Sequence, residues 1–157
     1  FRHYDVEKFA HKANLPDLLA CMLPEQIEQC DSLLQARLEA AEIYRSSLDS
    51  LVQAGLVRLP EFDIKNTKHA WHLFVVLVSA DIRDAIINVL NNAGIGVAVN
   101  FRSLSHLSEY KHLTFPNAEQ WGSECISLPF YPDIQANEIK YVVDKLTQAL
   151  RATDDVM

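Results

Sequence analysis

The stretch HAWHLFVVLVS, at residues 69–79, sets the fold of this 157-residue chain. Its β-branched and aromatic side chains predict a strand that is buried on both faces or nearly so. A helix is expected from Asp81, which can cap it, and Gly94 stands where a left-handed helix end would fall. The sequence IGVAVNF, at residues 95–101, then predicts a second strand.

A long helical pattern precedes this unit, from Pro16 to about Ala54. Pro16 and Pro24 each suit a first helical turn, so we expect a short helix followed by a long one. Apolar residues at steps of three, four and seven give the long helix one stripe, formed by Ile27, Leu34, Leu38, Ala41, Tyr44, Leu48 and Leu51. Such a helix must lie across a larger body or a partner subunit, because alone it would expose the stripe.

Three shorter elements are expected in the last third of the chain. Asn117 is expected to cap a short helix that ends near Cys125, SLP at 127–129 predicts a third strand, and the last helix runs from about Gln135 to Leu150. This order predicts the α/β class, with a small sheet covered by helices plus a long N-terminal helix. The pattern leaves parallel and antiparallel pairing equally open.

Composition narrows the class of protein. The formal net charge of −7 disfavours nucleic-acid binding, since no basic face is available to neutralise phosphates. Cys21, Cys30 and Cys125 are an odd set without a CxxC pair, which indicates neither a disulfide framework nor a zinc site and favours the reducing cytoplasm. No signal-peptide pattern or membrane-length apolar run is visible, so no membrane partner is expected. The chain opens in mid-pattern at Phe1, which suggests a truncated piece.

His69 and His72 invite a metal-binding interpretation. On a helix, residues three apart share a face, but in a strand they point to opposite faces and cannot hold one ion. Because the segment reads as a strand, we expect no metal site, with one histidine packed and the other exposed.

Polar residues around the end of the second expected strand are candidates for binding. Arg102 offers a planar fork of donors for a phosphate or carboxylate, and His106 can titrate near neutral pH. The alternative is a surface loop with a solvated arginine, which composition alone favours. Asn14 stands just before the first expected helix, where it is either a cap or an amide that binds an anion.

Four blocks of the sequence together are more specific than any one motif. They are KANLPDLLACMLPEQI at 12–27, HAWHLFVVLV at 69–78, RDAIINVLNNAGIGVAVNFRSL at 83–104 and FPNAEQWGSECISLPFYPDI at 115–134. In this order they resemble the DegT/DnrJ family of pyridoxal-phosphate sugar aminotransferases over residues 11–150. Lys12, Asn14, Asp17, Ala20 and Gln26 match the first family block. Within the family the likeness is closest to enzymes that aminate a nucleotide-linked 4-keto sugar, such as the aminoarabinose-forming aminotransferase.

The resemblance implies that residues 1–157 are the small C-terminal domain of a fold-type I enzyme. It further implies transfer of an amino group from glutamate to a keto sugar, nucleotide-linked, for cell-surface polysaccharide or lipopolysaccharide synthesis, by a homodimer. In the family, a lysine upstream of the first block holds pyridoxal phosphate as a Schiff base. None of the seven lysines of this chain stands in that motif. We therefore expect the large lysine-bearing domain to be absent from this chain, which alone would be inactive and would not bind the cofactor.

The resemblance also implies roles for four residues. Asn14 matches the asparagine that reaches the cofactor phosphate of the neighbouring subunit, and Phe101, Arg102 and His106 fall in the segment that lines the substrate entrance. The chain departs from the family where Asn100 replaces a histidine before an aromatic residue. Ser105 also stands at a second family histidine, with His106 one place later. These departures favour the alternative that the domain lost catalysis and keeps only dimerisation, sugar binding or a regulatory role.

Overall fold

Two antiparallel strands form the sheet of this protein, whose computed structural model describes residues 14–61 and 67–154. Strand β1 covers Phe74–Leu77 and β2 covers Cys125–Leu128. Phe74 pairs with Leu128 and Val76 with Ile126, so these four side chains share one face of the sheet. The pairing that the sequence left open is therefore antiparallel.

The second expected strand, residues 95–101, is the clearest departure from the sequence prediction. Only Ala98 pairs, in an isolated bridge in which Ala98 and Ser127 exchange both backbone hydrogen bonds. Arg58 forms a similar isolated bridge with Leu77, on the edge of β1 that does not pair with β2. Gly96 lacks a side chain to pack, which disfavours a continuous strand. The first expected strand is also shorter than predicted, since Trp71 has a φ of 46° and interrupts the extended run before Phe74.

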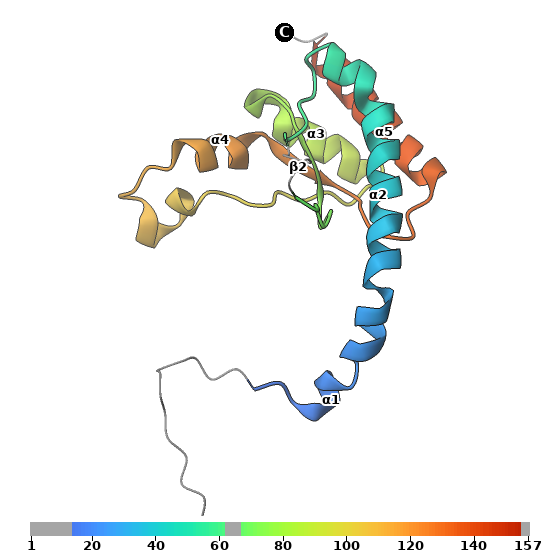
Figure 1. The fold of residues 1–157 in the computed structure, drawn as a ribbon. Coiled ribbons are helices and arrows are strands. Elements are labelled where there is room, and N and C mark those ends of the chain that lie inside the picture. The colour runs from blue at the N-terminus through green and yellow to red at the C-terminus, as the bar shows by residue number, and fades with distance from the viewer. Residues whose placement is uncertain (1–13, 62–66, 155–157) are drawn as a thin grey trace, which may run out of the picture. The chain divides into compact units, whose positions relative to one another are not determined.

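The helices follow the predicted order, and Figure 1 shows them along the chain. They are α1 (Asp17–Ala20), α2 (Leu23–Gln53), α3 (Ala80–Asn92), α4 (Pro116–Glu124) and α5 (Ala136–Asp154), with 3-10 turns η1 (Leu104–His106) and η2 (Ser108–Tyr110). Two of these helices have a different N-cap residue from the one predicted. Ser79, not Asp81, is the N-cap of α3, and Phe115, not Asn117, is the N-cap of α4. Gly94 does end α3 in the left-handed region, with a φ of 77°, as predicted.

The chain divides into two compact units, Phe1–Ser32 and Leu33–Met157, each described by itself. In the first unit, the described residues form α1 and the first part of α2. Several of its large apolar side chains are exposed, namely Leu15, Leu18, Leu19, Met22, Leu23 and Ile27. Cys21 is exposed as well.

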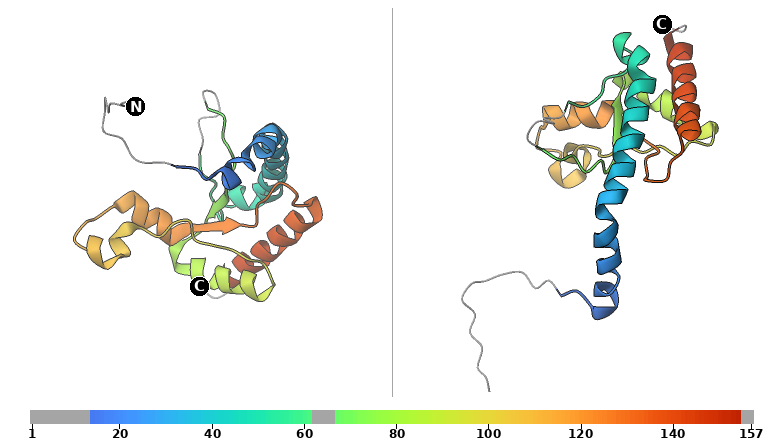
Figure 2. Two further views of the ribbon diagram at one scale, coloured as in Figure 1. Left: turned by 90° about the horizontal axis from the view of Figure 1, so that it is seen from below. Right: turned by 45° about the vertical axis from the view of Figure 1, so that its right-hand side comes forward.

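The second unit holds the hydrophobic core. The predicted stripe of α2 is buried there through Ala41, Tyr44, Leu48 and Leu51. Helices α3 and α5 pack side by side, as both views of Figure 2 show. Their buried side chains are Ile86 and Leu90 of α3 with Ile139, Val142, Val143, Leu146, Ala149 and Leu150 of α5. A small sheet covered by helices, with a long N-terminal helix, is thus confirmed. No helix in the described part of the chain is long and apolar enough to cross a membrane.

Candidate functional site

Residues 100–106, here called the 100–106 segment, carry three of the four candidate residues. Phe101 is 73% exposed, and Arg102 and His106 are also exposed. Among residues 14–61 and 67–154, no partner bonds or pairs with the Arg102 guanidinium. The structure therefore brings an aromatic ring, an unpaired cation and an imidazole onto one exposed segment.

Ser103 stabilises this segment through hydrogen bonds inside it. It is buried and is the N-cap of η1, where its hydroxyl accepts a bond from the backbone N–H of Ser105 at 3.3 Å. The hydroxyls of Ser103 and Ser105 also lie 2.9 Å apart, within hydrogen-bond distance. The exposed side chains of the segment thus extend from a short turn in which Ser103 and Ser105 bond each other.

Helix α4 holds the segment from the other side. The indole N–H of Trp121 donates to the backbone oxygen of Asn100 at 3.0 Å. The backbone of residues 101–103 passes over Gly122 so closely that a Cβ there would lie 3.1 Å from Ser103 N and 3.2 Å from Phe101 O. A side chain at this position would push the neighbouring backbone by a few tenths of an ångström, so glycine favours the close approach.

Glu119 lies in the first turn of α4, near the segment. Its carboxylate accepts a bond from the backbone N–H of Phe115 at 3.0 Å, which satisfies a donor at the start of α4. The Phe115 N–H, the hydroxyl of Ser105 and the nearby His106 together lower the pKa of the Glu119 carboxyl, while desolvation opposes them. The carboxylate thus bonds the start of α4, and its surroundings favour its ionised form.

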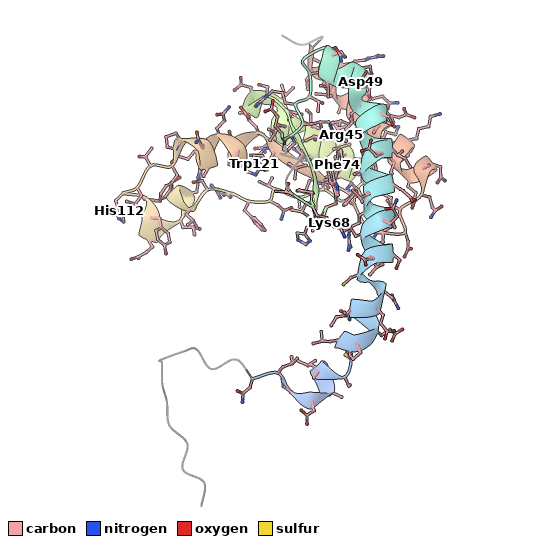
Figure 3. All side chains as sticks on the ribbon, in the orientation of Figure 1. Arg45, Asp49, Lys68, Phe74, His112 and Trp121 are labelled. Atoms are coloured by element: carbon pink, nitrogen blue, oxygen red, sulfur yellow. The ribbon has the colours of Figure 1, made fainter. Side chains whose placement is uncertain are left out.

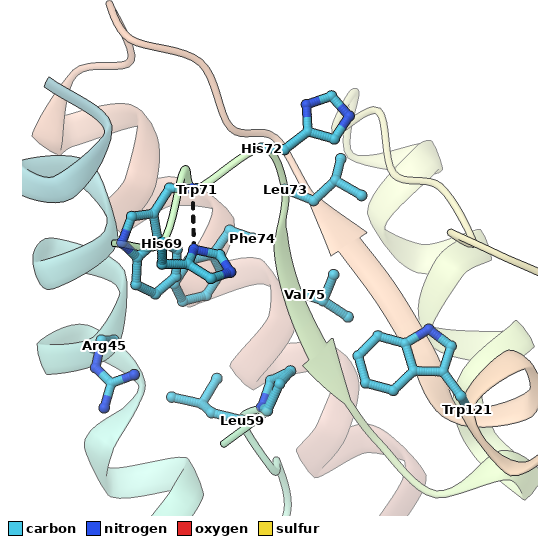
Figure 4. A pocket seen from close by; sticks show the side chains of 10 residues that line it. Arg45, Leu59, His69, Trp71, His72, Leu73, Phe74, Val75 and Trp121 are labelled. Carbon is cyan, nitrogen blue, oxygen red and sulfur yellow. Dashed lines mark hydrogen bonds between the residues drawn. The ribbon is translucent and has the colours of Figure 1, made fainter. Parts of the chain in front are cut away.

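A mostly apolar cavity of about 230 Å³ adjoins the same tryptophan. Figure 4 shows Trp71 and Phe74 at one side, Trp121 of α4 at the other and Val75 between them, with Arg45 of α2 below Trp71 in this view. Trp121 therefore lines the cavity with its ring while its N–H holds Asn100. Sequence reasoning missed this cavity.

The two histidines of the HAWH motif do not converge, and the segment that carries them is not a strand. His69 is partly buried, and its Nδ1 accepts a bond from the backbone N–H of Trp71 at 3.0 Å, while His72 is exposed. Within the described ranges, 14–61 and 67–154, no three His, Cys, Asp or Glu side chains gather as metal ligands would.

Asn14 lies in the first unit, and Phe101, Arg102 and His106 lie in the second. Asn14 is exposed and is not the cap of α1, because Pro16 is the N-cap residue. No other residue that the structure describes bonds its amide. Within the described residues, its two amide hydrogens thus have no acceptor.

Glu119, Trp121 and Gly122 are the site residues that sequence reasoning missed. A glutamate shortly after a phenylalanine–proline helix start is a detectable signal, since side chains of the first turn often bond the cap N–H. A glycine inside a helical pattern also points to a packing reason. Trp121 gave no such signal, because its role depends on a contact with a residue 21 positions away.

Comparisons with known proteins agree with the fold. The model of the DegT/DnrJ/EryC1/StrS aminotransferase family matches residues 1–147. The proposed sugar aminotransferase Spr1654 of Streptococcus pneumoniae, apo-form, is 26% identical with a TM-score of 0.81 over 98% of this chain and 40% of that one. It has also been solved in PLP- and PMP-forms.

Two further structures are similar. NtdA of Bacillus subtilis with bound cofactor PMP is 27% identical, with a TM-score of 0.80 over 93% of this chain and 35% of that one. The aminotransferase TlmJ of Streptoalloteichus hindustanus is 22% identical, with a TM-score of 0.83 over 96% of this chain and 41% of that one, and shares the fold. The chain spans about two fifths of the length of the solved structures it matches.

Proposed function

This chain belongs to the DegT/DnrJ/EryC1/StrS aminotransferase family, and from that membership we propose that it is the C-terminal part of a pyridoxal-phosphate-dependent sugar aminotransferase. The proposed reaction moves an amino group from glutamate to a keto sugar that is linked to a nucleotide. The product would serve the synthesis of cell-surface polysaccharide or lipopolysaccharide. The observation that carries this proposal is the family match over residues 1–147.

The 100–106 segment supports a substrate-binding role. The exposed Phe101 ring offers an apolar face to a sugar or base, and the Arg102 guanidinium can take a phosphate in its planar fork. The exposed His106 imidazole adds ring nitrogens that can donate or accept a hydrogen bond. An anionic nucleotide-linked sugar matches this combination of an aromatic face with a free cation.

Asn14 fits a cofactor phosphate, because its exposed amide has two donors that no described residue uses. We propose that it contributes this amide to the active site of a neighbouring subunit. Pyridoxal phosphate, when bound, supplies the electron sink that amino-group transfer needs. The chain's own share is to bind the phosphate through Asn14 and to orient the sugar through Phe101 and Arg102.

The cofactor-binding lysine is proposed to lie outside these 157 residues, in a large domain of the complete protein. A lysine that acts on the cofactor must be desolvated or otherwise tuned by its neighbours. Lys68, Lys111 and Lys140 are exposed, and the half-buried Lys145 donates to Gln148. These surface positions support a division of labour in which this part binds and another part carries the reaction centre.

A homodimer in the cytoplasm is part of the same proposal. The exposed apolar side chains of the first unit, such as Leu18 at 79% and Ile27 at 66% exposure, suit burial against another chain or domain. All three cysteines are free, which suits a reducing compartment.

A second candidate function rests on Ser105. Its hydroxyl lies 2.9 Å from that of Ser103, and a serine cannot take up a proton near neutral pH as a histidine can. A family domain that keeps dimerisation, sugar binding or a regulatory role without catalysis is consistent with that change.

Spectroscopy of the complete gene product separates the two. The aminotransferase should be yellow as purified and lose its colour with glutamate, and a keto-sugar nucleotide should restore the colour. Replacing the cofactor-binding lysine should abolish the colour altogether. A complete reading frame without such a lysine, or a colourless protein that takes up no pyridoxal phosphate, would leave the non-catalytic module as the better explanation.

A further inference from the structure

The backbone that leads into the 100–106 segment is hydrogen-bonded at two successive points. Ala98 exchanges both backbone hydrogen bonds with Ser127 of β2, at N–O distances of 3.2 and 2.7 Å. Two residues later, the backbone oxygen of Asn100 accepts the indole N–H of Trp121 at 3.0 Å. Phe101 follows directly, so the bond from Trp121 is the one of the two that lies next to the exposed side chains.

The segment itself lies at the surface of the second unit. The side chains of Phe101 and Arg102 are exposed, and the long stretch between η1 and α4 extends away from the sheet. Figure 3 places His112 at the outer tip of that stretch, whereas Trp121 lies close to the sheet. The direction in which Phe101 and Arg102 extend therefore depends on how Trp121 and Gly122 hold the backbone at its start.

The part of α4 that carries Trp121 is itself fixed to the rest of the unit. Arg83 of α3 donates from Nη1 to the backbone oxygen of Gly122 at 3.2 Å. Glu124, the last residue of α4, forms an ion pair with Arg58, and β2 begins at the next residue. Trp121 thus extends from a helix end that α3 and the sheet both hold in place.

The two parts of the Trp121 side chain have separate contacts. Its half-buried ring lines the apolar cavity together with Leu59 and Val75. Its N–H, which can only donate, bonds the Asn100 oxygen. Phenylalanine at this position would keep an aromatic ring at the cavity but could not hold that oxygen, so the two contacts can be separated by one substitution.

We propose that Trp121 is a positioning residue for the sugar substrate, whose indole N–H fixes the Asn100 carbonyl and so sets the direction in which Phe101 and Arg102 extend. This inference rests on the proposed function and deepens it, because it assigns substrate orientation to a residue that acts through the backbone of the segment. A displacement of about 1 Å is enough to weaken a substrate contact strongly. One hydrogen bond at the start of the segment can therefore affect how the sugar is held.

Tyr141 provides a matched control in the same unit. Its phenol donates to the backbone oxygen of Ala93 at 3.0 Å, the same length as the bond from Trp121 to Asn100. Trp121→Phe and Tyr141→Phe thus each keep an aromatic ring and remove one donor to a backbone oxygen. Only Trp121→Phe releases the backbone that leads into the 100–106 segment.

Amide hydrogen exchange on the complete gene product tests the structural part of the inference. In Trp121→Phe, exchange across residues 98–104 should quicken about fivefold, as expected when one hydrogen bond is lost. Exchange there should stay at the wild-type rate in Tyr141→Phe. The amides of α2 around Tyr44 and Leu48, two fully buried residues, should remain slow in both variants and so show that the fold is retained.

Single-turnover kinetics on the same protein test the functional part. In Trp121→Phe, kcat/KM for the sugar half-reaction should fall about three- to tenfold, which corresponds to the loss of one hydrogen bond. The glutamate half-reaction should stay unchanged, and Tyr141→Phe should change neither. Equal losses in both half-reactions would indicate general damage to the protein and would overturn the inference.

A double variant shows whether Trp121 acts through the exposed side chains. Arg102→Ala alone should lower kcat/KM for the sugar half-reaction, because it removes the proposed phosphate contact. When Arg102 is already alanine, Trp121→Phe should cause a smaller further loss, since one of the two side chains that it positions is gone. Fully additive losses would mean that Trp121 acts by another route and would overturn the positioning role.

The two levels of the proposal fail in different ways. A wild-type protein that aminates no sugar would refute the proposed function and the sugar-specific role with it. An active wild type whose sugar half-reaction is unchanged in Trp121→Phe would refute the positioning role alone. A slower sugar half-reaction in Trp121→Phe without quicker exchange at residues 98–104 would also refute only that role.

Discussion

The ring of Tyr44 stacks on the ring of Phe74, with centroids 4.5 Å apart and planes inclined by 21°. Tyr44 comes from α2 and Phe74 from β1, so the pair joins the long helix to the sheet. Trp71 and Phe130 surround Phe74 at centroid distances of 6.1 and 5.9 Å. Aromatic pairs at such distances stabilise a fold beyond the apolar area that they bury.

Replacement of Phe74 by alanine should destabilise the protein strongly. The side chain is 2% exposed and lies at the centre of the aromatic cluster, so its loss leaves a cavity that the neighbours cannot close. We expect a cost of about 3–5 kcal/mol in the free energy of unfolding, measured by urea denaturation. Phe101→Ala is the matched control, because this phenylalanine is 73% exposed and should change stability by no more than about 0.5 kcal/mol. Equal costs at the two positions would contradict the assignment of the core.

Tyr44 should make stability fall at alkaline pH. Burial, and then the negative charges of Tyr131 and Glu138, raise the pKa of the Tyr44 phenol above its ordinary value. The folded state therefore holds the phenol proton more tightly than the unfolded chain does. This stabilisation is complete below the unfolded pKa of about 10 and is lost as pH rises from there toward the folded pKa. Urea denaturation at a series of pH values should show a decline that starts near the unfolded pKa.

Tyr44→Phe tests this assignment. The variant loses the bond from the phenol to the backbone oxygen of Pro129, 2.8 Å long, and should be less stable by about 1–2 kcal/mol near neutral pH. Its alkaline decline should be smaller than that of the wild type. Tyr141→Phe removes an exposed phenol that also donates to a backbone oxygen, that of Ala93, and controls for the bond alone. An alkaline decline as steep in Tyr44→Phe as in the wild type would rule Tyr44 out as its source.

The helices could be predicted from the sequence because their signals are local. The stripe of α2 that includes Tyr44 and Leu48 recurs at helical spacing, and the structure buries these residues. The expected strand at residues 95–101 failed for a different reason. Whether such a segment pairs over its length depends on partners far away in the chain, and here only Ala98 meets Ser127.

The candidate site could be predicted only where its residues are consecutive. Phe101, Arg102 and His106 share one exposed segment because they are neighbours in the chain. Trp121 and Gly122 act through contacts with residues 19 to 21 positions before them, and a local pattern does not identify those partners. The glycine within the α4 pattern was the one local hint of this close approach.

Gly122→Ala should disturb the 100–106 segment without disrupting the core. The new methyl group would meet backbone atoms of residues 101–103 at 3.1–3.3 Å, and a backbone gives way less easily than a flexible side chain. The free-energy cost of displacing the segment should exceed the gain of about 1 kcal/mol that alanine brings to a helix in place of glycine. Hydrogen exchange should quicken at residues 101–103 and kcat/KM for the sugar half-reaction should fall. Gly96→Ala, where no atom lies within 4 Å of the added carbon, should leave both quantities unchanged. Unchanged exchange in Gly122→Ala would show that the segment does not depend on this approach.

Asn14 should act on the cofactor of a neighbouring subunit, and mixed dimers can test this. Asn14→Ala should weaken pyridoxal phosphate binding in the complete protein, and Asn14→Asp should weaken it further, because a carboxylate repels a phosphate. A variant without the cofactor-binding lysine should be inactive by itself. If Asn14 serves its partner, unfolding and refolding the lysine variant together with Asn14→Ala creates dimers in which one site has both groups intact. Random pairing of equal amounts should restore about one quarter of the sites. If Asn14 serves its own subunit, every site lacks one group, and the mixture should show no more activity than its two components measured separately.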